Sequence, residues 1–164
     1  EDFYFLVFSD HGQTEIRERI DLYSLFSKNG KDLNDYLHFI DSCYARFWFK
    51  NDEEREEIEK VLSKLEDIGV ILTNNLLKKY HAEMPGEYGD LIFCLKEHFV
   101  FDIINPKDRF MHGYLPDNTD LDGVCVSNKK IKGPYIKLQD IAPSILQALD
   151  IRIPEYMDGE VIWK

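Results

Sequence analysis

The sequence has no long apolar run and no excess of positive charge. No stretch approaches the roughly 20 apolar residues that a membrane-spanning helix needs, so we expect no membrane partner. The formal net charge is −11. Because affinity for nucleic acid comes largely from lysine and arginine that neutralise phosphates, this balance argues against a nucleic-acid partner. Small anionic esters remain open as substrates where a metal ion supplies positive charge locally.

Cysteine is also scarce. The chain has three cysteines, Cys43, Cys94 and Cys125, and none of them forms a C-x-x-C pair. This spacing supports neither a zinc finger nor a disulfide framework. Reduced thiols are typical of cytoplasmic proteins, so we expect a cytoplasmic location.

Hydrophobic residues make up 44% and charged residues 31% of the 164 positions, as in a globular protein. Residues 3–8 form a continuous apolar run, which predicts a strand buried on both faces, as in the middle of an α/β sheet. Residues 39–49 are aromatic and predict either one strand or two short strands that meet near Asp41. Residues 90–95 and 99–104 predict an antiparallel strand pair, and residues 124–127 predict a further short strand.

Helices are predicted between these strands. Asn51, with Glu54 three residues later, has the form of a capping box, and apolar residues at helical spacing continue from there to Gly69. Further helices are predicted over residues 74–81 and 140–149, the second with its proline in the first turn. Strands and helices therefore alternate, and we predict a single α/β domain over residues 1–164.

The tetrapeptide Ser9-Asp10-His11-Gly12 follows the predicted opening strand directly. In open α/β sheets, ligands bind beyond the carboxyl ends of the strands. Aspartate supplies a hard oxygen and histidine a neutral nitrogen, a combination that suits zinc, manganese or iron. An alternative interpretation is that Asp10 and His11 only cap the segment that follows.

A second histidine lies in the segment Met111-His112-Gly113-Tyr114, within a loop rich in asparagine, proline, aspartate and glycine. Taken alone, a His-Gly pair in a loop usually indicates a turn in which the imidazole is exposed. His38, His81 and His98 fall in predicted strands or near a helix end, so we interpret them as structural.

The order of these elements resembles the C-terminal half of the alkaline phosphatase superfamily, most closely its nucleotide pyrophosphatase/phosphodiesterase branch. Ser-Asp-His-Gly comes first, His112-Gly113-Tyr114 second, and the helix segment Asp140-Ile141-Ala142-Pro143-Ser144 last. The resemblance covers roughly residues 3–13 and 88–162. It implies an alkaline-phosphatase-like mixed sheet flanked by helices, present here as its C-terminal portion.

The resemblance also implies the roles of individual residues. Asp10 and His11 would bind the metal that holds the nucleophile, and His112 would bind a second metal. Two divalent ions, zinc foremost and manganese or iron as alternatives, would activate the nucleophile and stabilise the leaving oxygen. Asp140 would accept backbone N–H bonds at the start of its helix. The implied function is hydrolysis of phosphodiesters, pyrophosphates or phosphomonoesters.

The family's nucleophilic serine or threonine and its first aspartate ligand lie upstream of Ser-Asp-His-Gly, and only eight residues precede Ser9. We therefore expect no catalytic nucleophile in this chain, and expect it to be inactive alone and part of a longer polypeptide. The missing N-terminal portion is then a partner. A fragment of this kind should expose an apolar sheet edge, through which it could form a homo-oligomer.

Other functions stay open. A sulfatase-like or phosphomutase-like enzyme could use the same scaffold, and a non-catalytic acidic interaction domain could keep the fold without the chemistry. Residues 14–105 could form a cap-like insertion that selects the substrate. In that case four aromatic side chains could stack on a flat group of the substrate: Tyr23, Tyr36, Phe47 and Trp48. Aromatic residues at strand spacing more often belong to the core.

Overall fold

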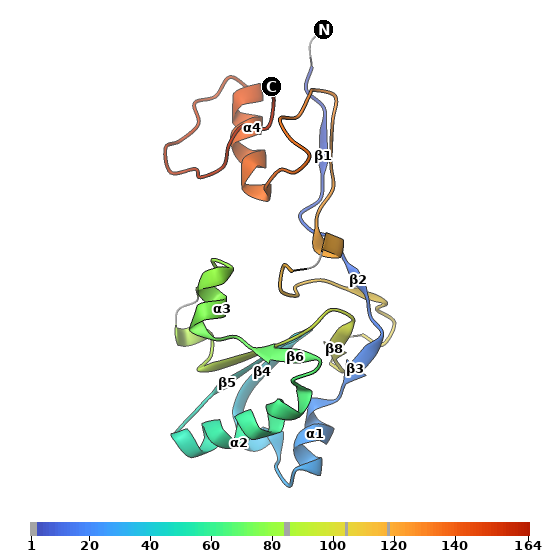
Figure 1. Cartoon of the computed structure of the whole chain (residues 1–164), viewed down its shortest axis with the longest axis vertical. Coiled ribbons are helices and arrows are strands. Elements are labelled where there is room, and N and C mark those ends of the chain that lie inside the picture. The colour runs from blue at the N-terminus through green and yellow to red at the C-terminus, as the bar shows by residue number, and fades with distance from the viewer. Residues whose placement is uncertain (1–2, 84–85, 104, 118) are drawn as a thin grey trace. The chain divides into compact units, whose positions relative to one another are not determined.

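The computed structural model describes residues 3–83, 86–103, 105–117 and 119–164 (Figure 1). The chain forms two compact units: unit 1 is Glu1–Gly12 with Asp122–Lys164, and unit 2 is Gln13–Leu121. The range 14–105 lies inside unit 2, and both the single domain and the cap-like insertion stay predictions. Among the described residues, no helix is long and apolar enough to cross a membrane.

Unit 1 is built on a two-stranded antiparallel ribbon. Strand β1 (Leu6–Phe8) pairs with β10 (Cys125–Ser127), and Val7 lies opposite Val126. A short 3₁₀ helix (Leu138–Asp140) leads into helix α4 (Ile141–Ala148), which confirms the predicted C-terminal helix. A small core of buried side chains belongs to this unit: Ile141, Pro143, Ser144, Ile162 and Trp163.

The opening strand is not buried on both faces, which corrects the sequence prediction. Phe5 and Val7 are each 49% exposed, and Val124 and Val126 are 65% and 58% exposed. Side chains alternate along a strand, so Val7 and Val126 share a face of the ribbon. Within the described part of the chain β1 pairs only with β10. Phe5, Val7, Val124 and Val126 are called here the apolar face of unit 1.

Unit 2 contains a four-stranded antiparallel sheet in the order β4-β5-β7-β6. Its strands are β4 (Leu37–Asp41), β5 (Tyr44–Trp48), β7 (Leu91–Leu95) and β6 (Gly69–Ile71). β4 and β5 form a hairpin whose turn contains Ser42 at a positive φ of 51°. The alternative of two short strands meeting near Asp41 is therefore confirmed.

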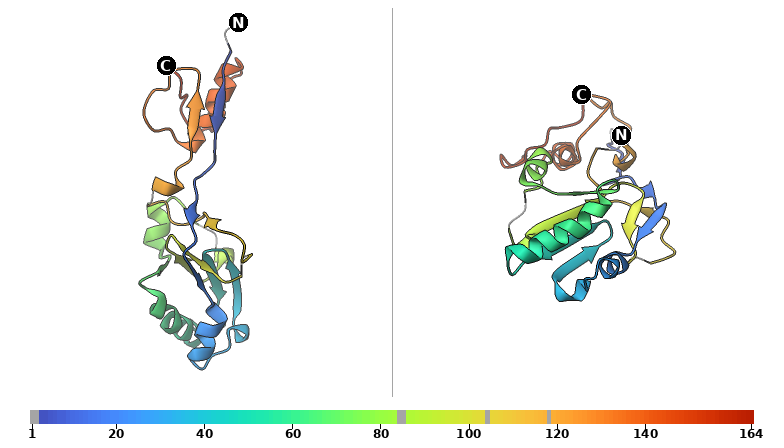
Figure 2. Two further views of the ribbon diagram at one scale, coloured as in Figure 1. Left: turned by 90° about the vertical axis from the view of Figure 1, so that its right-hand side faces the viewer. Right: turned by 60° about the horizontal axis from the view of Figure 1, so that its bottom comes forward.

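Helix α2 (Asp52–Leu62) packs on this sheet, as Figures 1 and 2 show. Its apolar residues belong to the same buried core as alternate residues of the central strands: Ile58, Val61 and Leu62 of the helix with Ala45, Phe47, Leu91 and Phe93 of the sheet. Alternation places these strand residues on one face, which explains why that face attracts the helix. The main core of the protein therefore lies in unit 2.

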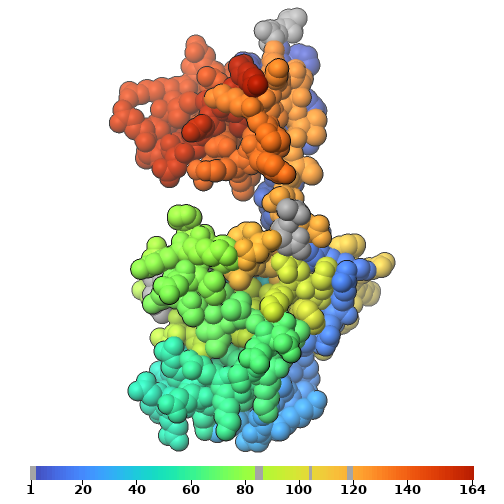
Figure 3. Space-filling view, in the orientation of Figure 1, coloured from blue at the N-terminus to red at the C-terminus, as the bar shows by residue number. Residues whose placement is uncertain are grey.

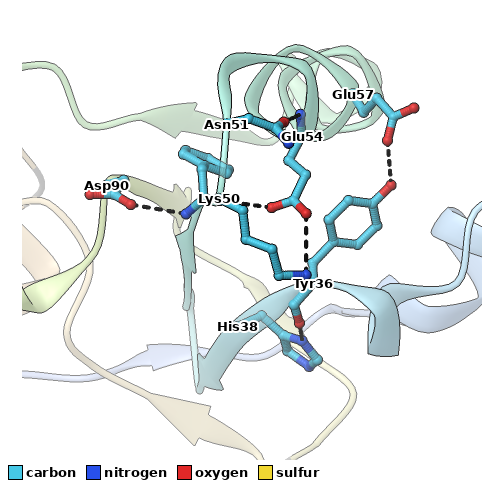
Figure 4. Close-up of polar contacts among 8 residues, drawn as sticks. Tyr36, His38, Lys50, Asn51, Glu54, Glu57 and Asp90 are labelled. Atoms are coloured by element: carbon cyan, nitrogen blue, oxygen red, sulfur yellow. Dashed lines mark hydrogen bonds and ion pairs between the residues drawn. The ribbon is translucent and has the colours of Figure 1, made fainter.

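The start of α2 confirms the predicted N-cap. The side chain of Asn51 accepts a hydrogen bond from the Glu54 amide at 2.9 Å, and a Glu54 carboxylate oxygen accepts one from the Lys50 amide at 2.9 Å (Figure 4). The predicted end of the helix was wrong. The α-helix ends at Leu62, a 3₁₀ turn (Ser63–Leu65) follows, and Gly69 begins β6 instead of ending the helix.

Strands lie within the predicted ranges 90–95 and 99–104, but they do not pair with each other, and the second ends at Phe101, after which a turn begins. β7 pairs with β5 and β6, while β8 (Phe99–Phe101) pairs in parallel with β3 (Glu18–Ile20). His98 has a positive φ of 76°, which redirects the chain between the two strands. Ile104, the last residue of the predicted strand, lies outside the described residues.

The remaining elements of unit 2 are short. β2 (Thr14–Glu15) pairs antiparallel with β9 (Phe110–Met111). Helix α1 (Leu22–Lys28) begins after Asp21, and helix α3 (Asn74–Lys79) confirms the helix predicted over residues 74–81. Three further 3₁₀ turns are Leu33–Asp35, Gly86–Tyr88 and Thr119–Leu121.

Candidate functional site

The segment after β1 is held firmly against β10 in unit 1. The Ser9 amide donates to the Val124 carbonyl at 3.0 Å, and the Ser9 hydroxyl oxygen accepts from the Val124 amide at 3.0 Å. A Cβ atom on Gly123 would lie 2.7 Å from the Ser9 carbonyl oxygen, so only glycine fits at this position. Ser9 thus fixes the backbone from which Asp10 and His11 project.

Asp10 and His11 form a defined pair. One carboxylate oxygen of Asp10 accepts from the His11 amide at 3.0 Å, and the other lies 3.3 Å from Nε2 of His11. Nδ1 of His11 lies 2.9 Å from the Gly12 carbonyl oxygen, which can only accept, so Nδ1 carries the hydrogen. Metal-binding histidines usually have this second hydrogen bond to an acceptor.

His112 belongs to unit 2 and follows β9 directly. Gly113 has a positive φ of 91°, which favours glycine and turns the chain sharply after His112. Tyr114 is buried, and its hydroxyl donates to the Phe99 carbonyl at 3.0 Å. Burial also raises the pKa of Tyr114 above its ordinary value, so the hydroxyl stays protonated. Tyr114 therefore anchors the loop that carries His112.

The joint binding of metal ions by these three residues stays a prediction, because Asp10 and His11 belong to one unit and His112 to the other. Among the residues that the structure describes, no group of three or more histidine, cysteine, aspartate or glutamate side chains is arranged to hold a metal ion. The Asp10–His11 pair supplies two donors, whereas a zinc site ordinarily has four ligands. The donor set suits the predicted metals, and the site needs further ligands.

Two of the other histidines have structural contacts. Nδ1 of His38 lies 2.9 Å from the Tyr36 carbonyl oxygen, and its Nε2 lies 3.1 Å from the Tyr23 hydroxyl. His98 makes a hydrogen bond of 2.8 Å to the Glu15 carbonyl. These contacts tie segments of unit 2 together, in agreement with the structural interpretation.

One spacing was missed in the sequence. Asp108 precedes His112 by four residues, an Asp-x-x-x-His spacing that would place both side chains together on a helix. Here the pair spans the extended strand β9. Extended residues four apart are separated by about 13 Å, whereas a helix brings them to about 6 Å. Asp108 and His112 are therefore not placed side by side as one metal-binding pair.

The proposed aromatic stack is not formed by all four predicted residues. Phe47 is completely buried and Tyr36 is 8% exposed, so both belong to the core of unit 2. Trp48 donates from its indole nitrogen to the Glu87 carbonyl at 3.2 Å, and Tyr23 is exposed. Tyr36 and Phe47 are thus core residues and cannot stack on a substrate.

Asp140 accepts backbone N–H bonds, as the resemblance implied, but not from α4. Its carboxylate oxygens accept from the Lys137 amide at 2.9 Å and from the Glu160 amide at 2.8 Å. The fully buried Ser144 hydroxyl donates to the Asp140 carbonyl at 2.5 Å and accepts from the Ile162 amide at 3.0 Å. Asp140 and Ser144 therefore join α4 to the C-terminal segment and have a structural role.

Comparison with solved structures defines the class of fold: part of an alkaline-phosphatase-like domain of the nucleotide pyrophosphatase/phosphodiesterase type. Human ectonucleotide pyrophosphatase/phosphodiesterase 5 matches with a TM-score of 0.68 and 16% identity, over 96% of this chain and 43% of that chain. The murine protein matches with a TM-score of 0.70 and 14% identity, over 94% and 43%. An inactive variant of the murine protein in complex with AMP gives a TM-score of 0.65, with 15% identity.

The chain thus spans 43% of the length of these solved structures. No protein-family model and no curated protein matches it. At these identities the comparison establishes the fold, and it confirms the predicted resemblance and fold class.

Proposed function

We propose that this chain is the metal-binding lobe of a metal-dependent hydrolase of phosphodiesters, pyrophosphates or phosphomonoesters, whose nucleophile lies in an upstream portion of a longer polypeptide. The Asp10–His11 pair after β1, in a chain with this fold, carries the proposal. The 43% coverage of the matched structures supports the existence of the upstream portion. The chain alone is expected to be inactive.

Asp10, His11 and His112 would hold the metal ions, zinc foremost. When bound, two divalent ions supply the positive charge that activates the nucleophile and stabilises the leaving oxygen. The residues of this chain orient the ligands. The Gly12 carbonyl fixes the His11 tautomer, and the His11 amide fixes one Asp10 oxygen. Fixed ligands lose little freedom when they coordinate a metal.

For the substrate we propose a small nucleotide ester. The murine structure in complex with AMP supports this choice, since its fold covers 94% of this chain. The chain has a net charge of −11, which repels an anionic substrate. Bound metal ions would supply the positive charge that such a substrate needs at the site.

The test is hydrolysis by the longer polypeptide. The substrates are the p-nitrophenyl ester of AMP, bis(p-nitrophenyl) phosphate and p-nitrophenyl phosphate, with p-nitrophenyl sulfate to detect a sulfatase. His11→Gln and His112→Gln should each lower kcat/KM about 100-fold or more, as expected when a metal ligand is lost. His81→Asn is the matched control, because His81 is exposed near the end of α3.

Each outcome decides between hypotheses. Hydrolysis of the sulfate alone would replace the proposal with a sulfatase. Absence of hydrolysis, together with absence of metal binding by the longer polypeptide, would favour a non-catalytic interaction domain. Unchanged activity of both histidine variants would contradict the assignment of these ligands.

The upstream portion is also the proposed partner of the apolar face of unit 1. Phe5, Val7, Val124 and Val126 are exposed on the β1–β10 ribbon, and a contiguous exposed apolar patch is typical of an interaction surface. Coexpression with the upstream portion should give a stable complex. A Val7→Ser, Val126→Ser double variant should weaken it. If the chain instead forms only homo-oligomers that the double variant dissociates, the face is an interface between copies.

The cytoplasmic location is a separate proposal, supported by the unpaired cysteines. Cell fractionation of the longer polypeptide with compartment markers tests it, and enrichment in the secreted fraction would contradict it.

A further inference from the structure

Unit 2 contains a hollow that the predicted metal ligands do not use. It lies between helix α3, the end of β7 and the segment that follows His112, and its volume is about 380 Å³. Small-molecule sites usually have volumes of about 300–1,000 Å³. From its lining and its place in the chain we infer that this hollow binds the apolar organic group of the ester substrate. The inference rests on the proposed function, because it names the part of the substrate that the chain selects.

The floor of the hollow is apolar. Leu95 is 1% exposed and Tyr114 is 6% exposed, while Val70, Leu76 and Leu115 are half-buried around them. An aliphatic floor with an aromatic wall gains free energy from contact with an aromatic or short aliphatic group. It offers no comparable gain to a bare phosphate, whose transfer from water to such a surface is unfavourable.

The wall formed by α3 is held in place by a polar cluster. The Lys79 ammonium lies 2.7 Å from the Tyr80 hydroxyl and 3.3 Å from an Asp117 oxygen, and the Tyr80 hydroxyl donates to Asp117. The hydrogen bond from Tyr80 holds the pKa of Asp117 below its ordinary value, so the carboxylate stays charged. In the space-filling view α3, in green, lies beside the segment after His112, in orange (Figure 3). These contacts link the end of α3 to Asp117 on the opposite side of the hollow.

The place of the hollow in the chain connects it to the predicted metal ligand of unit 2. Leu115 follows His112 by three residues, so the two Cα atoms are at most about 11 Å apart. The organic group of an ester can occupy the hollow while its phosphorus lies near the His112 loop. On the rim, the Lys96 ammonium donates to the Asp67 carbonyl at 2.8 Å, so its side chain is held at the edge of the hollow.

The experiment uses the chain itself, without metal, so that its result does not depend on hydrolysis. Methyl groups are observed by NMR while phenol, phenyl phosphate or inorganic phosphate is added to about 10 mM, well above a Kd near 1 mM. Phenol and phenyl phosphate should shift the methyl signals of Val70, Leu76, Leu95 and Leu115. Inorganic phosphate should leave these signals unchanged.

Variants locate the binding site. Leu76→Trp fills the hollow and should weaken binding of phenol and phenyl phosphate about tenfold or more. Leu37→Trp is the control, because Leu37 is 65% exposed on β4 of the same unit. A second variant, Lys79→Gln, should release the wall and weaken binding without adding volume. Undisturbed methyl signals of the α2 core show that each variant is folded.

Three results would overturn the inference: no shift with phenol, shifts that persist in Leu76→Trp, or shifts caused by phosphate and not by phenol. If the longer polypeptide did not hydrolyse esters, the proposed function would be contradicted, but the result of the binding experiment would still hold. The two failures are therefore distinguishable.

Discussion

Nε2 of His11 lies 3.3 Å from a carboxylate oxygen of Asp10, while Nδ1 of the same ring is engaged by the Gly12 carbonyl. Two adjacent residues thus direct an oxygen and a nitrogen donor toward each other. The pair is suited to share a cation, and the backbone that holds it is fixed by Ser9.

Zinc affinity of the longer polypeptide should depend on Asp10. Asp10→Asn removes an anionic oxygen donor, so we expect the Kd for zinc to rise about tenfold or more in isothermal titration calorimetry. Asp158→Asn, another exposed aspartate of unit 1, should leave the Kd unchanged. Equal effects of the two variants would indicate nonspecific attraction by the negative charge of the chain.

Gly123→Ala should destabilise unit 1. The added Cβ would lie 2.7 Å from the Ser9 carbonyl oxygen, so the backbone must shift at a cost of about 1–3 kcal/mol. Urea unfolding followed by Trp163 fluorescence, in a Trp48→Phe background, reports this unit. Gly133→Ala is the control, because its Cβ would have an ordinary contact of 3.6 Å. A similar loss of stability in both variants would refute the steric explanation.

Ser144→Ala should also destabilise unit 1, by about 1–3 kcal/mol, because the buried Ile162 amide loses its hydrogen-bond acceptor. Ser144→Thr keeps the hydroxyl and should lose less. The same Trp163 fluorescence measures both free energies of unfolding. If threonine were as harmful as alanine, the effect would come from packing and not from the hydrogen bonds.

The stability of unit 2 should decline in acid through Glu57. Hydrogen bonds from Lys31 and then from the Tyr36 hydroxyl, drawn for Tyr36 in Figure 4, hold the pKa of Glu57 below its ordinary value of 4.5. Because the folded pKa is the lower one, this stabilisation is complete above about pH 4.5 and is lost as the pH falls through the folded pKa.

The measurement is urea unfolding between about pH 3 and pH 6, followed by Trp48 fluorescence in a Trp163→Phe background. Glu57→Gln should be less stable than the wild type at pH 6 and should lose less stability on acidification. Glu56→Gln, an exposed neighbour on α2, should follow the wild type. A Glu57→Gln curve parallel to that of the wild type would show that Glu57 does not contribute to the acid response.

Local patterns in the sequence determined much of the secondary structure. Asn51 with Glu54 predicted the start of α2, and Asp140 predicted the start of α4, because helix starts depend on a few neighbouring residues. The ordered motifs around Asp10, His112 and Asp140 determined the fold class, which the structural comparison confirms. They also named the candidate ligands, since residue type alone limits which atoms can bind a metal.

Only the tertiary structure decided how strands pair and which surfaces are covered. β8 pairs with β3, about 80 residues away, and not with β7, because the partner of a strand is decided by contacts far along the chain. The apolar run over residues 3–8 predicts a buried strand. Its sequence shows that these side chains can be buried, but it does not show which other segment would cover them. Among the residues that the structure describes, β1 pairs with β10 alone, and Phe5 and Val7 are each 49% exposed.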